Sequence, residues 1–155
     1  MKRLILITVI IAIVLIGCAS TSAPPSRSDF SYVQGREWKL TEVRINDTRT
    51  GFNRASLSST VFGELFTVNF NAEDIGGVGA LNRFSSPYSL GDGRAITFAL
   101  IRSTLMAPLS EPEGLREHDF FVYLQNTHRW NLANNNLELY SRTGDGREIR
   151  LIFSQ

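Results

Sequence analysis

From residue 37 to residue 153 the sequence consists of short segments in which apolar and polar residues alternate, separated by polar turns. Such alternation is typical of β-strands that bury one face of a sheet. The segments do not alternate regularly with helical ones, so an antiparallel sheet is favoured over a parallel one. Glycine-rich segments indicate strong bending. We therefore predict the α+β class: a strongly curved, mostly antiparallel sheet forming a partial barrel, with one packed helix.

The alternation also places the individual strands. Between Leu40 and Val43 it slips once, which indicates a β-bulge in the first strand. Gly91-Asp92-Gly93 predicts a tight hairpin turn. The polar segment 46–60 is expected to be a long loop. Strands are expected at 37–45, 66–70, 75–84 (bent by glycine), 88–90, 96–100, 130–132, 137–140 and 149–153, the last three as a meander.

One segment, 111–126, has helical spacing. Ser110 and Glu113 form a capping box at its start, and Pro112 lies in the first turn, where its missing N–H costs nothing. A wide apolar face predicts that the helix packs on the sheet. The residues of that face are Leu115, Phe121, Val122 and Leu124, and the residues expected to remain on the polar side are Arg116, Glu117, Asp119 and Gln125.

The N-terminus has the features of a targeting signal. Lys2 and Arg3 precede an apolar run of 13 residues, Leu4 to Ile16, interrupted only by Thr8. A membrane-spanning helix needs roughly 20 such residues. We therefore interpret residues 1–17 as a signal peptide. The cysteine that follows indicates the signal peptide of a lipoprotein.

Leu15-Ile16-Gly17-Cys18 resembles the bacterial lipobox, in which a signal peptidase leaves an acylated cysteine at the new N-terminus. We predict lipidation, by palmitate or a similar acyl chain, at Cys18, which anchors the protein to a membrane of the bacterial cell envelope. Ala19 rather than Asp follows, which favours the periplasmic face of the outer membrane. The alternative is a plain signal peptide or a short uncleaved anchor. Because Cys18 is the only cysteine, no intrachain disulfide can form.

Residues 18–34 are predicted to form the lipidated cysteine and a flexible tether. From Ala19 to Ser31 the chain is rich in Ser, Thr, Ala and Pro, a composition that buries little apolar surface. The folded domain is expected to comprise residues 35–155. With 43% hydrophobic residues in the chain, this domain can bury a core without a disulfide.

Charge and motifs exclude several classes of function. The chain has 16 Lys or Arg and 15 Asp or Glu, so it has no basic excess for binding nucleic acid. It contains no nucleophile elbow and no phosphate-binding glycine loop, so we predict no catalytic residue, metal or cofactor. His118 and His128 lack the spacing of a helical zinc site. Asp92 and Asp145 lie in Gly-Asp-Gly-Arg sequences, which predict hairpin turns rather than calcium loops.

Arginine dominates the basic residues. Lys39 is the only lysine beyond the signal peptide. Arginine binds carboxylates and phosphates with two parallel hydrogen bonds, so these residues could contact lipid headgroups or sugars. The alternative is a solvated surface on which the arginines pair with acidic side chains.

Two segments resemble the META domain of HslJ-like bacterial envelope proteins. They are Gly79-Ala80-Leu81-Asn82-Arg83-Phe84, with Tyr88 shortly after, and Ser103-Thr104-Leu105-Met106-Ala107. Trp38-Lys39-Leu40 and Phe120-Phe121 stand where that family has a first-strand Trp and a Phe-rich helix. The resemblance covers about residues 35–153. It implies a curved antiparallel sheet with one helix, often on a lipoprotein, links to stress response, antibiotic tolerance or virulence, and no established catalytic residues.

Asn82, Thr104 and Met106 are the motif residues whose role is unknown. In the structural interpretation, Asn82 closes a turn or forms hydrogen bonds with the sheet backbone, and Thr104 caps or bridges backbone groups. In the alternative, both side chains contact a ligand. Leu81 and Pro108 stand where the family has cysteines. If those cysteines pair in relatives, this chain replaces the cross-link by apolar packing.

We expect a membrane-anchored, non-enzymatic META-domain lipoprotein that supports envelope integrity or the stress response through contacts with an envelope protein. The alternative is a carrier, similar to the pilot lipoproteins of secretion systems, that holds a lipid or another apolar ligand between the curved sheet and the helix. The ten Phe residues motivate this second hypothesis. Fold alone does not decide between the two.

Overall fold

The computed structural model describes residues 27–59, 63–106, 111 and 114–155. Several predicted features lie outside these residues, namely the signal peptide, Cys18, most of the tether, Pro108, and Ser110, Pro112 and Glu113 of the predicted capping box. Within the described part, no helix is both long and apolar enough to cross a membrane.

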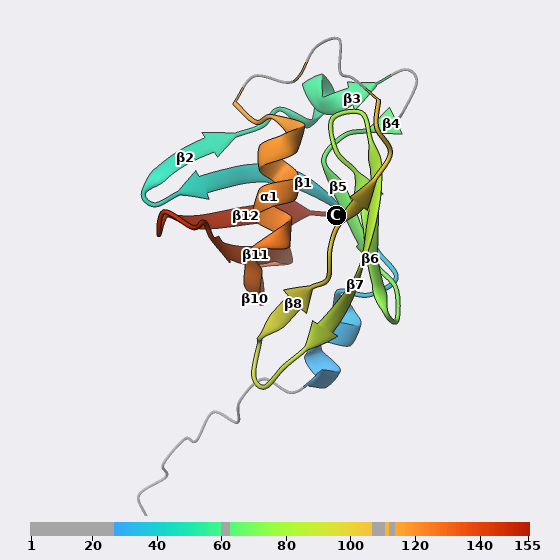
Figure 1. The fold of residues 1–155 in the computed structure, drawn as a ribbon, viewed down its shortest axis with the longest axis vertical. Coiled ribbons are helices and arrows are strands. Elements are labelled where there is room, and N and C mark those ends of the chain that lie inside the picture. The colour runs from blue at the N-terminus through green and yellow to red at the C-terminus, as the bar shows by residue number, and fades with distance from the viewer. Residues whose placement is uncertain (1–26, 60–62, 107–110, 112–113) are drawn as a thin grey trace, which may run out of the picture.

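One antiparallel sheet dominates the fold (Figure 1). Its strands follow the order β10-β11-β12-β1-β5-β6-β7-β8, and β2 pairs with β1 while β9 pairs with β7. These strands are β1 (Glu37–Ile45), β2 (Thr48–Gly51), β5 (Thr67–Phe70), β6 (Asp74–Val78), β7 (Arg83–Leu90), β8 (Ile96–Phe98), β9 (Arg102–Ser103), β10 (Thr127–Ala133), β11 (Asn136–Arg142) and β12 (Glu148–Ser154). The remaining described elements are the hairpin β3 (Ser58–Ser59) and β4 (Gly63–Glu64), the 3-10 helices η1 (Arg27–Tyr32) and η2 (Arg54–Leu57), and the helix α1 (Glu117–Gln125).

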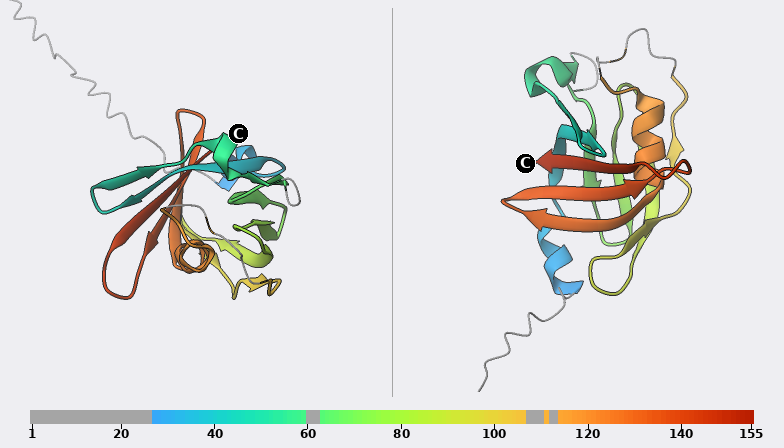
Figure 2. Two further views of the ribbon diagram at one scale, coloured as in Figure 1. Left: turned by 90° about the horizontal axis from the view of Figure 1, so that it is seen from above. Right: turned by 90° about the vertical axis from the view of Figure 1, so that its left-hand side faces the viewer.

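The sheet curves so strongly that its two ends nearly meet. Ala95, just before β8, forms an isolated bridge with Arg129 of β10. Beside it, the amide of Trp130 donates a hydrogen bond of 3.0 Å to the carbonyl of Arg94. The left view of Figure 2 shows α1 end-on, in the opening of the curved sheet between β11 and β8. The predicted partial barrel with one packed helix is therefore confirmed.

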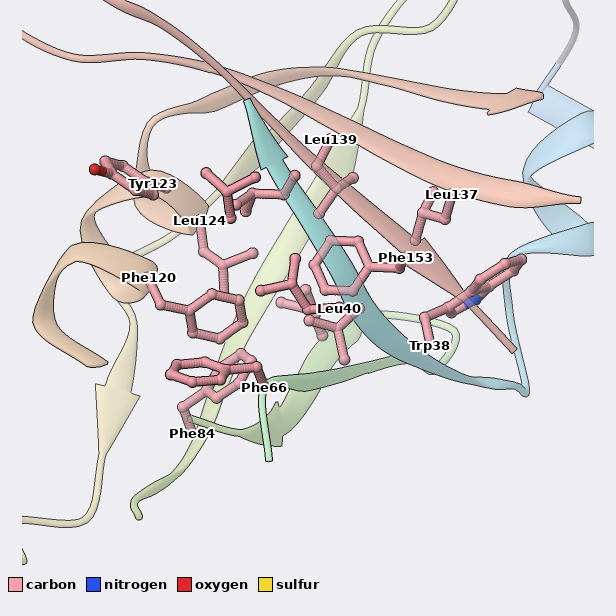
Figure 3. Close-up of a cluster of buried hydrophobic side chains, with 14 of the residues drawn as sticks. Trp38, Leu40, Phe66, Phe84, Phe120, Tyr123, Leu124, Leu137, Leu139 and Phe153 are labelled. Carbon is pink, nitrogen blue, oxygen red and sulfur yellow. The ribbon is translucent and has the colours of Figure 1, made fainter. Parts of the chain in front are cut away.

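Apolar side chains fill the space between α1 and the sheet (Figure 3). Phe120 and Leu124 point from the helix into this space and have no exposed surface. The ring of Phe120 packs edge-to-face against Phe66, which directly precedes β5, with 5.2 Å between centroids, and against Phe84 of β7, with 6.0 Å. Helix and sheet are thus joined by aromatic packing, which stabilises the pair beyond the area it buries.

The folded domain begins inside the segment that we predicted to be tether. Phe30 and Val33 are 1% and 0% exposed. The Phe30 ring packs edge-to-face against Phe70 and against Trp130, with centroid distances of 5.2 and 4.9 Å. The polar composition of the segment was misleading because two apolar residues suffice to hold a short 3-10 helix against a core. Phe30 and Val33, which precede the predicted domain start at residue 35, therefore pack as part of the buried core.

Several sequence predictions agree with the structure. The register between β1 and β12 shifts between Leu40 and Glu42, which places the β-bulge predicted between Leu40 and Val43 at Thr41. The hairpin across Gly91-Asp92-Gly93 joins β7 to β8. The C-terminal meander is β10-β11-β12, and the strand expected at 66–70 is β5, which starts one residue later.

The helix is shorter than the predicted 111–126 and begins at Glu117. Gly114 has φ +90°, a left-handed conformation that ends any helix at that point, and Arg116 is extended with ψ 148°. A side chain at Gly114 would also come within 2.9 Å of Thr50 Cγ2, so the chain passes close to β2 here. The first helical amide, of Glu117, donates to the carboxylate of Glu111 (2.9 Å) instead of to a capping box.

The long loop predicted at 46–60 is wrong in its first part. Residues 48–51 form β2, which pairs with residues 42–45 of β1 through a two-residue turn. Asn46 adopts φ 51°, which suits such a turn. The strand shows no alternation because, apart from half-buried Thr50, its residues are exposed.

The single bent strand predicted at 75–84 is also wrong. The chain forms two antiparallel strands, β6 and β7, joined by a turn at 79–82. In that turn the amide of Gly79 donates to the carbonyl of Asn82 (2.8 Å). Gly79 thus lies at a reversal of the chain, whereas Gly76 and Gly77 lie within β6.

Candidate functional site

The turn between β6 and β7 brings the motif residues together. Asn82 lies in this turn and is 5% exposed. Thr104 and Met106 follow the edge strand β9, which pairs with β7 beside the turn. The first residue of α1, Glu117, completes the cluster and is 6% exposed. We call these four residues the motif cluster.

The side chain of Asn82 uses both of its polar atoms twice. Its Oδ1 accepts hydrogen bonds from Thr104 Oγ1 (2.8 Å) and from the amide of Met106 (2.7 Å). Its Nδ2 donates to the carbonyl of Met106 (3.0 Å) and to Glu117 Oε2 (2.6 Å). All four hydrogen-bonding positions of the amide are filled, so Asn82 fastens the segment after β9 to the turn.

Glu117 is the anchor of the turn itself. Its Oε1 accepts the amides of Leu81 (2.8 Å) and Asn82 (2.7 Å). Among the described residues no Lys or Arg forms an ion pair with it, so its charge is stabilised by neutral donors and by its place at the N-terminus of a helix. Gly79 makes room for this carboxylate, because a Cβ at that position would lie 2.5 Å from Glu117 Oε1.

A hollow of about 460 Å³ opens beside the motif cluster. It is lined by Asn82, Ser103, Thr104, Leu105, Met106, Glu111, Glu117, His118 and Phe121. At its rim Leu105 is 96% exposed and Met106 41%, so both side chains are open to solvent. The hollow therefore combines a rigid polar floor with two exposed aliphatic side chains.

These contacts agree with the structural interpretation of Asn82 and Thr104. Asn82 closes a turn and bonds backbone, and Thr104 bridges, since its Oγ1 also accepts the amide of Arg83 (3.2 Å). No polar group of these two side chains is left without a partner inside the cluster. The arrangement can hold two loops in a fixed geometry, and it presents no activated nucleophile.

Glu117 was expected on the polar side of the helix and was not predicted to be a site residue. A signal was nevertheless present. Phe120 and Leu124 stand three and seven residues after Glu117, which is the spacing of one helix face. Gln125, also expected on the polar side, is half-buried. Its Nε2 donates to the carbonyl of Ala99 (2.9 Å), and its Oε1 accepts the amide of Ile101 (2.9 Å).

The other candidate residues lie apart from one another. His118 lines the hollow from α1, whereas His128 lies exposed on β10. In the part of the chain that the structure describes, no three His, Cys, Asp or Glu side chains gather to hold a metal. Asp92 and Asp145 lie in turns, followed by Gly93 and Gly146 with φ +63° and +83°, as predicted for hairpins. Leu81 is half-buried, and its predicted packing partner Pro108 lies outside the described residues.

Comparison with known proteins gives a family match and a similar solved structure. The family profile described as the META domain matches residues 31–151. A solved structure titled "NMR structure of the protein from Burkholderia xenovorans" is similar with a TM-score of 0.58 and 18% sequence identity, over 88% of this chain and 94% of that one. No curated protein sequence matches the chain. At this identity the solved structure supports the fold alone.

Proposed function

The chain belongs to the META domain family, and we propose that it is an envelope lipoprotein that works through contacts with another protein rather than by catalysis. In this proposal acyl chains on Cys18 anchor it to a membrane, preferably at the periplasmic face of the outer membrane. It serves envelope integrity or the response to envelope stress.

The observation that carries the proposal is the contrast between the floor and the rim of the hollow. The polar motif side chains are bonded to one another, whereas Leu105, directly between Thr104 and Met106, is 96% exposed. Burying a leucine side chain stabilises a contact by about 1.5–3 kcal/mol. The segment after β9 is fastened to the turn by these hydrogen bonds and still presents two aliphatic side chains to solvent, which suits a partner protein that covers them.

The chain between Cys18 and η1 limits how far η1 can lie from the proposed anchor. Between Cys18 and Arg27 at the start of η1 there are eight residues, 19–26, which reach at most roughly 30 Å when extended. In this proposal the domain begins within that distance of the membrane surface, which favours a partner near the membrane.

The carrier alternative receives less support. It requires space for an apolar ligand between α1 and the sheet, and Phe66, Phe120 and Leu124 occupy that space with no exposed surface. A ligand there would have to displace aromatic rings that pack edge-to-face. We therefore propose the contact function alone.

Anchoring and contact can be tested separately in bacterial cells that produce the full chain. Cys18→Ser should release the protein from the membrane fraction and abolish palmitate labelling. Retention of both would contradict the anchor. For the contact, a photo-crosslinking residue at the exposed Ser103 should yield one discrete adduct with an envelope protein.

Two leucine variants make the crosslinking experiment specific. Leu105→Asp should remove the adduct at Ser103. Leu100→Asp is the matched control, because Leu100 is 77% exposed and lies in the same segment but outside the residues that line the hollow. Loss of the adduct in both variants, or in neither, would contradict the proposed contact site.

A further inference from the structure

The outer face of strands β2, β1, β12, β11 and β10 carries a row of four arginines and one tyrosine. Arg49 of β2 stands directly opposite Arg44 of β1, and Arg44 stands opposite Arg150 of β12. Arg150 stands opposite Tyr140 of β11, and Tyr140 stands opposite Arg129 of β10. We call these five residues the arginine row. Residues directly opposite on neighbouring strands have Cβ atoms only about 5 Å apart.

Like charges in opposite positions destabilise a sheet, and two carboxylates only partly offset this repulsion. Glu42 accepts hydrogen bonds from Arg44 and from Arg49 Nη2 (2.6 Å). Glu138 lies 3.8 Å from Arg150 Nη1. Two carboxylates thus face four guanidinium groups, so the row retains positive charge.

Tyr140 holds the two least-paired arginines in place. The guanidinium carbon of Arg129 lies 3.7 Å from the centroid of the Tyr140 ring, and that of Arg150 lies 4.8 Å from it. β10 and β12 flank β11, so the ring stands between them. The Tyr140 hydroxyl donates to Glu138, which fixes the ring. Neither guanidinium donates a hydrogen bond to another described side chain, and stacking leaves their N–H edges pointing away from the ring.

The arginine row borders a hollow of about 420 Å³. Arg44, Arg129, Arg150 and His128 contribute basic groups to its lining, and Asp47 and Glu148 contribute acidic ones. Glu148 is already paired with Arg142. The hollow therefore offers several unused N–H donors around a space that could hold a small anion.

We propose that this hollow binds phosphate groups, with Arg129 and Arg150 as the principal ligands and Arg44 in support. A guanidinium presents parallel N–H groups that match two phosphate oxygens, and stacking on Tyr140 orients two such forks before any ligand arrives. Preorganisation of this kind lowers the entropic cost of binding. The phosphate can belong to a free phosphate compound or to the headgroup of a membrane lipid. The inference does not depend on the contact function proposed above.

The test uses residues 18–155, which lack only the predicted signal peptide, with Cys18→Ser, so that acylation cannot itself bind vesicles. Calorimetric titration with inorganic phosphate and pyrophosphate measures free anions. Co-sedimentation with phosphatidylglycerol vesicles, compared with phosphatidylcholine vesicles, measures headgroups in a bilayer. Binding to the free anions or to the anionic vesicles supports the site, and the two arms identify the source of the phosphate. Absence of binding in both overturns it.

Two double variants distinguish binding at this hollow from a general effect of positive charge on the protein. Arg129→Gln/Arg150→Gln should weaken binding by about tenfold or more. Arg83→Gln/Arg102→Gln removes the same charge from two exposed arginines on β7 and β9 that form no ion pair with a described residue, and it should change binding by less than about twofold. An equal loss in both variants overturns the proposal. Arg129→Lys keeps the positive charge but lacks the two parallel N–H groups of a guanidinium, so it should weaken binding. It provides a second variant if the double variant fails to fold.

Discussion

Glu117 and Glu138 are both carboxylates of one small domain, yet their surroundings are opposite in kind. Glu117 is buried in the motif cluster, and its partners are two backbone amides and the Asn82 amide. Glu138 lies on the outer face beside the arginine row, where guanidinium donors exceed carboxylate acceptors. Inside, donors and acceptors are matched; outside, donors are in excess.

This difference separates what holds the fold from what can bind. A buried polar group must find its partners within the protein, because leaving it unsatisfied costs about 1–3 kcal/mol. A matched cluster therefore fixes two loops and has little capacity left for a ligand. An exposed row with unused donors contributes little to stability and can accept an anion. We expect substitutions in the motif cluster to change stability, and substitutions in the arginine row to change binding.

The largest effect on stability should come from Glu117→Ala. The substitution leaves the amides of Leu81 and Asn82 and the Asn82 side chain without their acceptor, and we expect a loss of about 3–5 kcal/mol. Denaturant unfolding followed by the fluorescence of the buried Trp38 and Trp130 measures it. Glu73→Ala, at an exposed acid, is the control. A loss below about 1 kcal/mol for Glu117→Ala would contradict the anchoring role.

A smaller loss is expected for Gly79→Ala. Its Cβ would lie 2.5 Å from Glu117 Oε1 and 2.8 Å from Glu117 Cγ, so the carboxylate must shift, at a cost of about 1–3 kcal/mol. In the Glu117→Ala background this clash disappears, and Gly79→Ala should then cost much less. Additive losses in the double-mutant cycle would show that Gly79 acts independently of Glu117.

The smallest effect on stability should come from the carboxylates of the outer face, and it depends on pH. A hydrogen bond from Arg49 lowers the pKa of Glu42 below its usual 4.5. Burial raises the pKa of Glu138, but hydrogen bonds from Tyr140 and Asn131 outweigh it and lower the pKa. A lowered folded-state pKa contributes stability above the unfolded value of 4.5 that is lost as the pH falls through the folded value.

Glu42→Gln tests this contribution directly. At neutral pH the variant should be less stable than wild type by at most about 1 kcal/mol, because the arginine partners are partly exposed. The difference should shrink as the pH falls below the pKa of Glu42, where wild type is protonated too. Unfolding curves measured between pH 7 and pH 3 follow it. A difference that grows with acidity would reverse the sign expected here.

The sequence predicted best where one face of a strand is buried. The bulge at Thr41 and the C-terminal meander follow from alternation, which reports burial directly. β2 escaped detection because nearly all of its residues are exposed, so its sequence carries no alternation. The predicted start of α1 was wrong because a capping box reports only a local preference. The left-handed conformation of Gly114, where the chain passes close to Thr50, depends on the tertiary structure.

The candidate site was predicted only in part for a related reason. Asn82, Thr104 and Met106 were found through a family pattern, and the structure brings them together. Glu117 joins the cluster although it stands 35 positions after Asn82 in the sequence. Local spacing indicated that Glu117 shares a face with Phe120 and Leu124, but not which amides it would meet. Cross-chain partners of this kind depend on the closed shape of the sheet.

Amide hydrogen exchange at Leu81 and Asn82, measured by NMR on residues 18–155 with Cys18→Ser, tests most directly whether the buried carboxylate holds the motif turn. Both amides lie in a turn, where exchange is ordinarily fast, and both donate to Glu117 Oε1. The amides of Asp92 and Gly93, in another turn, donate to no described residue and serve as the internal reference. We predict protection at Leu81 and Asn82 equal to that of the neighbouring strand β7. Exchange as fast as at Asp92 and Gly93 would contradict the structural role of the motif cluster.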